Sequence, residues 1–252
     1  MARVWRDDNI VARELKRLHR PGSPVIVPSI WNLASLNAVL SLNTASEKPV
    51  KALATSAPAM AAALGLEIEE LEEDHILEAL ERISEAVVAS GLPLVVDVRD
   101  GYGDQLGYLV SDSMVHGAVG VEIGDSALGV LLDAERQTFR IRAAIKGGQG
   151  SNREIPDFVV NARMYLEFGA TTVTYASGPG RGLRREEIEV LVRELGGRVG
   201  VRLKDGEDAL TTRELAEIGV ARIDVGDSVY QIAMNAAKKA TARILGGRRL
   251  KA

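Results

Sequence analysis

LPLVVDVRDGYGD, at residues 92–104, begins as an apolar run and ends on three charged side chains followed by Gly-Tyr-Gly. Its first part, 93–98, has the length and the β-branched content of a buried strand. The charges are Asp97, Arg99 and Asp100, and they fall where the strand gives way to a turn. In α/β proteins, binding and catalytic groups lie at such strand ends. The stretch therefore indicates an α/β fold with its chemistry at the carboxyl ends of the strands.

Similar apolar runs recur along the chain and alternate with helical patterns. Before residue 92, for example, Ile76, Leu80, Ile83 and Val87 recur at helical spacing, and Gly91 is suited to end that helix. Strands that are apolar on both faces and separated by helices predict a parallel sheet covered by helices. The strand candidates are 24–29, 51–56, 93–98, 120–125, 171–176, 198–203 and 221–226.

These strands and one uncertain strand predict a closed (β/α)8 TIM barrel, with a leading helix near 8–19 and a trailing helix at about 228–245. The uncertain strand lies between 127 and 170 and has two interpretations. A strand at 158–163 would leave few residues for the crossover to the next parallel strand. A strand at 137–145, followed by a helix over 156–169, avoids this difficulty, and connectivity favours it.

The composition limits the possible functions. The chain has 252 residues, which fits one α/β barrel, so we expect a single domain over 1–252. A formal net charge of -4 gives no basic surface for nucleic acid. The absence of cysteine excludes disulfides, thiolate metal sites and cysteine nucleophiles. No run is long and apolar enough to span a bilayer, and the N-terminus lacks a signal sequence, so we expect a cytoplasmic protein.

Six segments, in order between about residues 10 and 245, resemble the isocitrate lyase and phosphoenolpyruvate mutase superfamily. The resemblance implies a (β/α)8 barrel, often with a terminal helix exchanged between subunits, and hence a homodimer or homotetramer. It also implies an enzyme that makes or breaks a C–C bond, or less often a P–C bond, next to a 2-oxo carboxylate through a Mg²⁺-bound enolate. The segments are RELKRLHRPGSPVIVPSIWNLAS, ATSAPAMAAALG, DVRDGYGD, GAVGVEIGDS, YLEFGATTV and ELAEIGVARIDVG.

The resemblance also implies a site, and the chain departs from it at the metal. Asp97, Arg99 and Asp125 fall at strand ends and are the candidate catalytic residues. The family's Asp-x-Asp is Asp97-Val98-Arg99 here, and the acidic residue before Asp125 is Gly124. The acidic position after the second strand falls at Ile68. Asp97 thus remains as the one expected metal ligand, which is a poor site for Mg²⁺, so we expect weak binding or none and no other cofactor.

Arg99 has two interpretations. Residues 97 and 99 share a face of an extended strand, so both would point toward the barrel mouth. A guanidinium there could replace part of the metal site and grip a substrate carboxylate. Alternatively, Arg99 could form a salt bridge to Glu122, Asp97 or Asp125 and only keep the site neutral.

The candidate substrate-binding residues follow other strands or stand in the Gly-Tyr-Gly turn. The resemblance implies that the backbone N–H groups of Ser56 and Ala57 bind the developing oxyanion. Trp31 follows the first strand and either contacts a small carboxylate substrate or packs in the core. Tyr102 and Lys204 complete the set, although Lys204 could instead be solvated. The segment SGPGRG, at 177–182, is a further candidate for anion binding.

Two classes of function remain open at this point. The first is a superfamily enzyme with a rebuilt metal site that acts on a small carboxylate. The second is a non-catalytic member that serves as a binding or assembly subunit.

Overall fold

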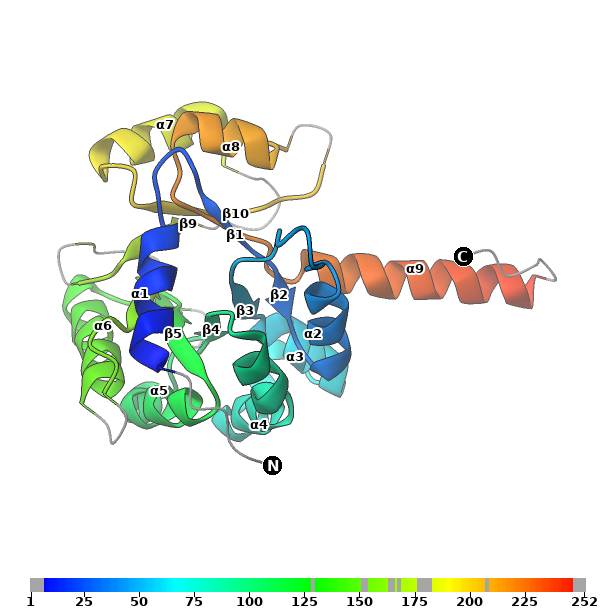
Figure 1. The fold of residues 1–252 in the computed structure, drawn as a ribbon, viewed down its shortest axis with the longest axis horizontal. Coiled ribbons are helices and arrows are strands. Elements are labelled where there is room, and N and C mark those ends of the chain that lie inside the picture. The colour runs from blue at the N-terminus through cyan, green and yellow to red at the C-terminus, as the bar shows by residue number, and fades with distance from the viewer. Residues whose placement is uncertain are drawn as a thin grey trace.

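The structure is a computed structural model that describes residues 7–127, 130–150, 154–162, 166, 169–175, 183–206 and 209–246. Parallel strands form one sheet, and helices lie around it (Figure 1). A short antiparallel hairpin, β6 (Ser126–Ala127) with β7 (Val130–Leu131), follows the fourth barrel strand. The strands of the main sheet are β1 (Val25–Val27), β2 (Ser29–Ile30), β3 (Leu53–Thr55), β4 (Leu94–Asp97), β5 (Ala118–Ile123), β8 (Val159–Ala162), β9 (Thr172–Tyr175), β10 (Val199–Arg202) and β11 (Arg222–Asp224).

The helices begin and end at residues that the sequence marks clearly. The Ser56 side chain caps the third helix, the Asp133 side chain caps the sixth, and Gly91 ends the fourth in a left-handed conformation. The helices are α1 (Asp8–Leu18), α2 (Leu33–Leu40), α3 (Ala57–Leu64), η1 (Ile68–Glu70), α4 (Glu73–Ser90), η2 (Gly103–Gln105), α5 (Leu106–Val115), α6 (Ala134–Gln149), α7 (Arg185–Glu194), α8 (Thr212–Ile218) and α9 (Ser228–Leu245).

The sheet closes into a barrel because the first apolar run supplies the strands at both edges of the sheet. The strand order is β1-β11-β10-β9-β8-β5-β4-β3-β2, so the two outermost strands are separated in sequence by Pro28 alone. The carbonyl of Val27 accepts the N–H of Val225 on one side, and the carbonyl of Pro28 accepts the N–H of Ala54 on the other. With β1 and β2 taken as one strand broken at Pro28, the sheet has eight strand positions. The predicted (β/α)8 barrel, with its leading and trailing helices, is confirmed.

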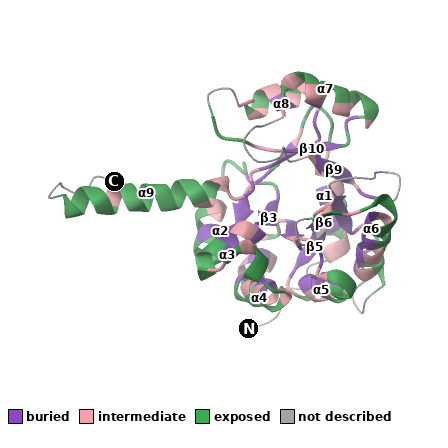
Figure 2. Cartoon of the chain, turned by 180° about the vertical axis from the view of Figure 1, so that it is seen from behind, coloured by how far each residue is buried: buried purple, intermediate pink, exposed green. Residues whose placement is uncertain are grey.

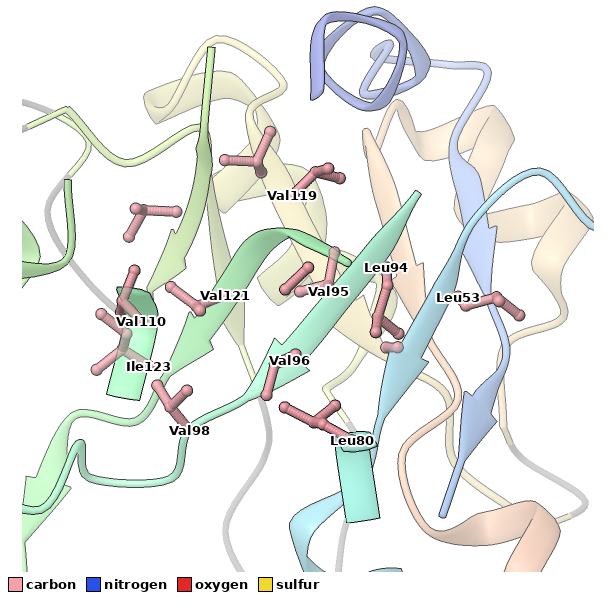
Figure 3. Packing of buried hydrophobic residues seen from close by; sticks show 14 of the residues in the cluster. Leu53, Leu80, Leu94, Val95, Val96, Val98, Val110, Val119, Val121 and Ile123 are labelled. Atoms are coloured by element: carbon pink, nitrogen blue, oxygen red, sulfur yellow. The ribbon is translucent and has the colours of Figure 1, made fainter. Parts of the chain in front are cut away.

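Apolar side chains fill the space between the strands and the surrounding helices. The main core includes the buried residues of β4 and β5 together with Leu80 of α4 and Val110 of α5 (Figure 3). A second cluster joins α7 and α8 to β10 and β11, and both helices lie on the same side of the barrel in Figure 1. Helix α1 packs against β5 and β8, with Leu15 fully buried, and closes the end at which the strands begin.

Helix α9 differs from the other helices because none of its residues is buried. It extends away from the barrel, and Figure 2 shows it exposed along its length. Val229, Ile232 and Ile244 on it are 40%, 60% and 49% exposed. Among the described residues, no helix is sufficiently long and apolar to cross a membrane.

The favoured interpretation of the uncertain strand is wrong. Residues 137–145 lie within the helix α6, and the strand is β8, Val159–Ala162, which corresponds to the rejected assignment at 158–163. The crossover rule failed because only residues 163–171 separate β8 from its parallel neighbour β9. The apolar alternation in 137–145 was also misleading, because Phe139 is 68% exposed. The buried face of α6 instead follows helical spacing and includes the polar residues Gln137 and Arg140.

Candidate functional site

Charged side chains gather inside the barrel at the carboxyl ends of its strands. Asp97 ends β4 and is paired in register with Glu122 of β5. Arg202 ends β10 and is paired with Asp224 of β11. Glu122 and Arg202 belong to strands that are not neighbours in the sheet, yet their side chains come within 3.8 Å, so they meet across the interior. In barrel enzymes, this end of the strands carries the active site.

Both carboxylate oxygens of Asp97 have protein donors. Oδ2 accepts the backbone N–H of Ala57 at 3.1 Å, and Oδ1 accepts that of Arg99 at 3.0 Å. The backbone N–H of Asp97 in turn donates to Thr55 Oγ1 at 2.9 Å. Asp97 therefore joins the ends of β3 and β4 and holds the turn that follows β4.

Arg99 does not continue the strand, so the expectation that it shares a face with Asp97 is wrong. Strand β4 ends at Asp97, and Arg99 has a φ of 54°, in the left-handed region. Its Nη1 donates to the carbonyl of Leu71 at 2.6 Å, and its guanidinium lies 5.4 Å from the centre of the Tyr102 ring. The Tyr102 hydroxyl donates to the same carbonyl at 2.7 Å. No ion pair from Arg99 to a carboxylate is found among the described residues, which contradicts the salt-bridge alternative as well.

The left-handed conformation of Arg99 has a direct consequence at Gly124. The N–H of Gly124 donates to the Arg99 carbonyl at 2.7 Å. A Cβ atom at Gly124 would lie 3.1 Å from that carbonyl oxygen, closer than ordinary van der Waals contact. The two departures from the family's metal pattern are therefore linked, because the turn that places Arg99 brings its carbonyl oxygen into tight contact with any Cβ atom at 124.

The residues present do not fit a magnesium ion at the position that the resemblance implies. Mg²⁺ requires near-octahedral oxygen ligands. Asp97 is the one carboxylate left at the family's positions, because Gly124 has no side chain and Ile68, in η1, is apolar. Over the described ranges, no group of three or more His, Cys, Asp or Glu side chains is arranged to hold a metal.

Arg222 organises the deepest part of the cluster. It is fully buried, and its Nε donates to both oxygens of Asp224 at 2.8 and 3.0 Å, while its Nη2 donates to Glu122 at 3.4 Å. Thr174 also donates to Asp224 at 3.4 Å. His19 of α1 lies 3.5 Å from Arg222, and burial together with this cation lowers the pKa of His19 to about 4. The pair Arg222–Asp224 is therefore satisfied within the protein.

Glu122 is a carboxyl group that can exchange a proton near neutral pH. Burial raises its pKa to about 7, and nearby Asp224 contributes in the same direction. The cations Arg222 and Arg202 oppose this shift without cancelling it. Such a pKa is characteristic of groups that transfer protons in active sites.

Arg202 contrasts with Arg222. Its side chain is 22% exposed, and its one ion pair within the described part of the chain is the 3.8 Å contact with Glu122. Its Nε is buried and has no acceptor there. A buried polar group without a partner costs about 1–3 kcal/mol, and more when it is charged. Burial lowers the pKa of Arg202, but Glu122, Asp97, Asp224 and Asp227 more than offset this, so the guanidinium stays charged.

Three of the remaining predicted substrate-binding residues, Ser56, Ala57 and Trp31, have partners within the protein. The N–H of Ser56 donates to the Ile30 carbonyl at 3.2 Å, and that of Ala57 donates to Asp97, so neither is available as a free oxyanion donor here. Trp31 packs edge-to-face on Tyr230 at 5.2 Å, which agrees with the packing alternative.

Lys204 is exposed beyond the end of β10, and the carbonyl of Asp125 accepts the N–H of Leu132. The segment 177–182 lies outside the described residues. The assignment of all the predicted residues to the site stays a prediction: Asp97, Arg99, Asp125, Trp31, Ser56, Ala57, Tyr102 and Lys204.

Sequence reasoning missed three charged residues of the cluster and gave Glu122 only the role of a possible partner of Arg99. Arg202, Arg222 and Asp224 stand in apolar strands, where a charge is unusual. Arg222 and Asp224 are two residues apart, so they point to the same side of the strand. Charges at this spacing in strands that are buried on both faces were the signal for an interior ionic cluster.

A surface hollow of about 680 Å³ lies apart from this cluster. It is on the outer face, between α5 and α6, and its lining includes Asp104, Phe139, Arg142 and Lys146. Its lining contains none of the predicted site residues, although it includes Arg140, which donates to the Gly124 carbonyl beside the mouth. The chemistry is therefore assigned to the mouth.

Comparison with known proteins decides the family. The family model described as phosphoenolpyruvate phosphomutase matches residues 15–164 and 162–245. The chain belongs to this family. An uncharacterized protein of Mycobacterium tuberculosis, Rv1998c, is 25% identical to this family member over 259 residues, which cover 92% of this chain and 89% of that protein.

Solved structures agree with the assignment. A structure described as a phosphonomutase from Burkholderia cenocepacia J2315 superposes with a TM-score of 0.76 at 27% identity, covering 95% of this chain and 99% of the other. Phosphonopyruvate hydrolase, solved with oxalate and Mg²⁺, has a TM-score of 0.76 at 20% identity, with 96% and 88% covered. Members of the superfamily cleave or transfer groups at C–C or P–C bonds next to keto acids.

Proposed function

We propose that this protein is an enzyme that makes or breaks a C–C bond, or less often a P–C bond, next to a 2-oxo carboxylate, without Mg²⁺ at the family position. The family membership supports the reaction class. One observation carries the proposal: Asp97 and Glu122 lie side by side on β4 and β5 and face Arg202. Charges are expensive to keep in a barrel interior and are retained there for a function.

The chemistry follows from what the reaction requires. In the cleavage direction, a base accepts the proton of a substrate hydroxyl group, the C–C bond breaks to give a carbonyl product and an enolate, and an acid returns a proton to the enolate carbon. Glu122, with a pKa near 7, is suited to hold and return that proton. Arg202, the fixed cation that faces Glu122, offsets the negative charge that develops on the enolate oxygen.

The proposed roles of the earlier candidates change accordingly. Asp97 orients the turn after β4 and adds a negative charge beside Glu122. Arg99 acts through the conformation of this turn, since its guanidinium is engaged by Leu71 and Tyr102. Asp125 borders the mouth from the other side of Gly124.

Proton NMR of the protein with a panel of 2-oxo and hydroxy acids tests the proposal. One series contains EDTA and a second contains MgCl₂. We expect the same substrate to be converted at similar rates in both, and Glu122→Gln to slow conversion by about 100-fold or more. Conversion that requires Mg²⁺ contradicts the rebuilt site. Conversion of no compound in either series favours the alternative, a non-catalytic binding or assembly subunit.

A further inference from the structure

Within the part of the chain that the structure describes, four arginines lie in or beside the barrel mouth, and three of them have their guanidinium groups bound by the protein. Arg222 is held by Asp224 and Glu122, and Arg99 donates to the Leu71 carbonyl. Arg140 donates to the carbonyls of Gly124 and Asp100 and to the Gln137 side chain. Arg202 has no hydrogen bond to any residue that the structure describes, and its buried Nε lacks an acceptor. The part of the guanidinium beyond Nε, which belongs to a side chain that is 22% exposed, is therefore free to bind a ligand.

The surroundings of Arg202 hold it in place without occupying its donors. Its Cδ and Nε lie 3.1 Å from the position that a Cβ atom of Gly226 would take, so the glycine makes room for this side chain. The nearest carboxylate, Glu122, is 3.8 Å from Nη2 and lies beyond hydrogen-bond distance. The neighbouring carboxylates have other partners, because Asp224 is bound by Arg222 and Asp97 by two backbone N–H groups.

We propose that Arg202 binds the carboxylate group of the substrate. The two terminal nitrogens of a guanidinium present two parallel N–H groups, which match the two oxygens of a carboxylate. The ligand class is a small carboxylate, such as a 2-oxo acid, whose reacting carbon then lies close to Glu122, the neighbour of Arg202. This assignment places the anion-binding cation at the end of β10 instead of Arg99 after β4. It deepens the proposed function and rests on it for the identity of the substrate.

Calorimetric titration of pyruvate and of oxalate into the protein, with EDTA present, tests the assignment. We expect Arg202→Gln to weaken binding by about 10- to 100-fold, since a charged, two-point contact is lost. Arg202→Lys keeps the charge but loses the paired geometry, and should recover part of the affinity. Arg198→Gln is the matched control, because Arg198 is exposed just before the other end of the same strand. It should bind as the unchanged protein does.

The thermal melting of the variants separates binding from a structural role. Arg202 has no hydrogen bond to lose, so Arg202→Gln should melt close to the unchanged protein. Equal affinity in the unchanged protein and Arg202→Gln overturns the assignment, as does the absence of binding of both carboxylates to the unchanged protein. A large loss of melting temperature in both Arg202 variants, with affinity kept, also overturns it.

The test of the Arg202 assignment can fail or succeed independently of the test of the proposed function. Loss of carboxylate binding in Arg202→Gln supports the assignment even when no substrate is converted. Conversion of a 2-oxo acid by Arg202→Gln with an unchanged kcat/KM leaves the proposed function in place and overturns the role of Arg202.

Discussion

At the barrel mouth, the residue that attracts attention in the sequence is not the one with open donors in the structure. Arg99 stands where the family has a second aspartate, but its positive φ turns it toward Leu71 and Tyr102. Arg202 stands at the end of an apolar strand that gave no motif, and its guanidinium has no hydrogen bond among the described residues. The direction of a side chain depends on where the strand ends. The alternation of side chains along an extended strand does not reveal that end point.

The contact between Gly124 and the Arg99 carbonyl leads to a prediction. Gly124→Glu restores an acidic side chain, but its Cβ would lie 3.1 Å from the Arg99 carbonyl. We expect the variant to lose about 1–3 kcal/mol of unfolding free energy in urea denaturation and to gain no Mg²⁺ affinity. We expect the double variant Arg99→Asp with Gly124→Glu to recover some Mg²⁺ affinity. Stoichiometric Mg²⁺ binding by Gly124→Glu alone, at unchanged stability, contradicts the link between the two positions.

His19 and Glu122 predict opposite effects of pH on stability. The folded pKa of His19, about 4, lies below the ordinary histidine pKa of 6.5, so its contribution to stability is present above pH 6.5 and is lost as the pH falls toward 4. The folded pKa of Glu122, about 7, lies above the ordinary glutamate pKa of 4.5, so its contribution to stability is present below pH 4.5 and is lost as the pH rises through 7.

The two variants His19→Gln and Glu122→Gln test this pair of effects. Denaturation between pH 5 and 8 should show Glu122→Gln gaining stability relative to the unchanged protein as the pH rises, by about 2 kcal/mol. His19→Gln should gain relative stability as the pH falls, by a similar amount. Parallel pH profiles for all three proteins would show that neither group has a shifted pKa.

At the scale of the elements, the sequence predicted seven strands and the helices between them, and it failed at one helix. Residues 137–145 alternate in polarity like a strand, yet they form α6. Gln137 and Arg140 are buried because they donate to the Gly124 carbonyl, a partner that comes from the end of β5. A pattern of apolar residues cannot reveal a helix whose buried face is partly polar and is satisfied by a distant loop.

The glycines of α5 and α6 give a prediction about how these helices pack. A Cβ atom at Gly148 would lie 2.4 Å from the Phe158 ring, so Gly148→Ala should reduce the unfolding free energy by about 1–3 kcal/mol. Gly107→Ala is the matched control, since nothing lies within 4 Å of its Cβ position. Alanine has the higher helix propensity, so the control should be neutral or stabilised by up to about 1 kcal/mol. Equal losses in both variants would contradict the close packing at Gly148.

At the scale of the whole molecule, the closed barrel was predictable because seven strands alternate with helices over a length typical of this fold. The single domain over 1–252 stays a prediction. The interior charges were not predictable as a cluster, because their partners lie on strands far apart in the sequence. Glu122, Arg202 and Arg222 meet only after the barrel has closed.

Helix α9 carries a prediction about assembly. Val229, Ile232, Ala236, Ala240 and Ile244 recur at spacings of three and four residues, which gives an apolar stripe on a helix with no buried residue. We expect this stripe to pack against a second copy of the chain in a homodimer or homotetramer. Ile232→Asp should shift the mass measured by light scattering toward the monomer, whereas Gln231→Asp, on the opposite side of the helix, should not. A monomeric unchanged protein at micromolar concentration would contradict the expectation.

A titration with Mn²⁺, followed by the electron paramagnetic resonance signal of the free ion, tests most directly whether the barrel mouth works without a divalent metal. Mn²⁺ takes the same oxygen ligands as Mg²⁺. The protein is titrated alone and with saturating oxalate, a carboxylate that would complete a metal site. We expect the free-ion signal to rise as it does in the matched buffer, which contains the same oxalate in the second titration, because Asp97 is the one carboxylate at the family's positions and Gly124 offers no ligand. Loss of one equivalent of free Mn²⁺ per chain, with tighter binding when oxalate is present, would contradict the rebuilt site.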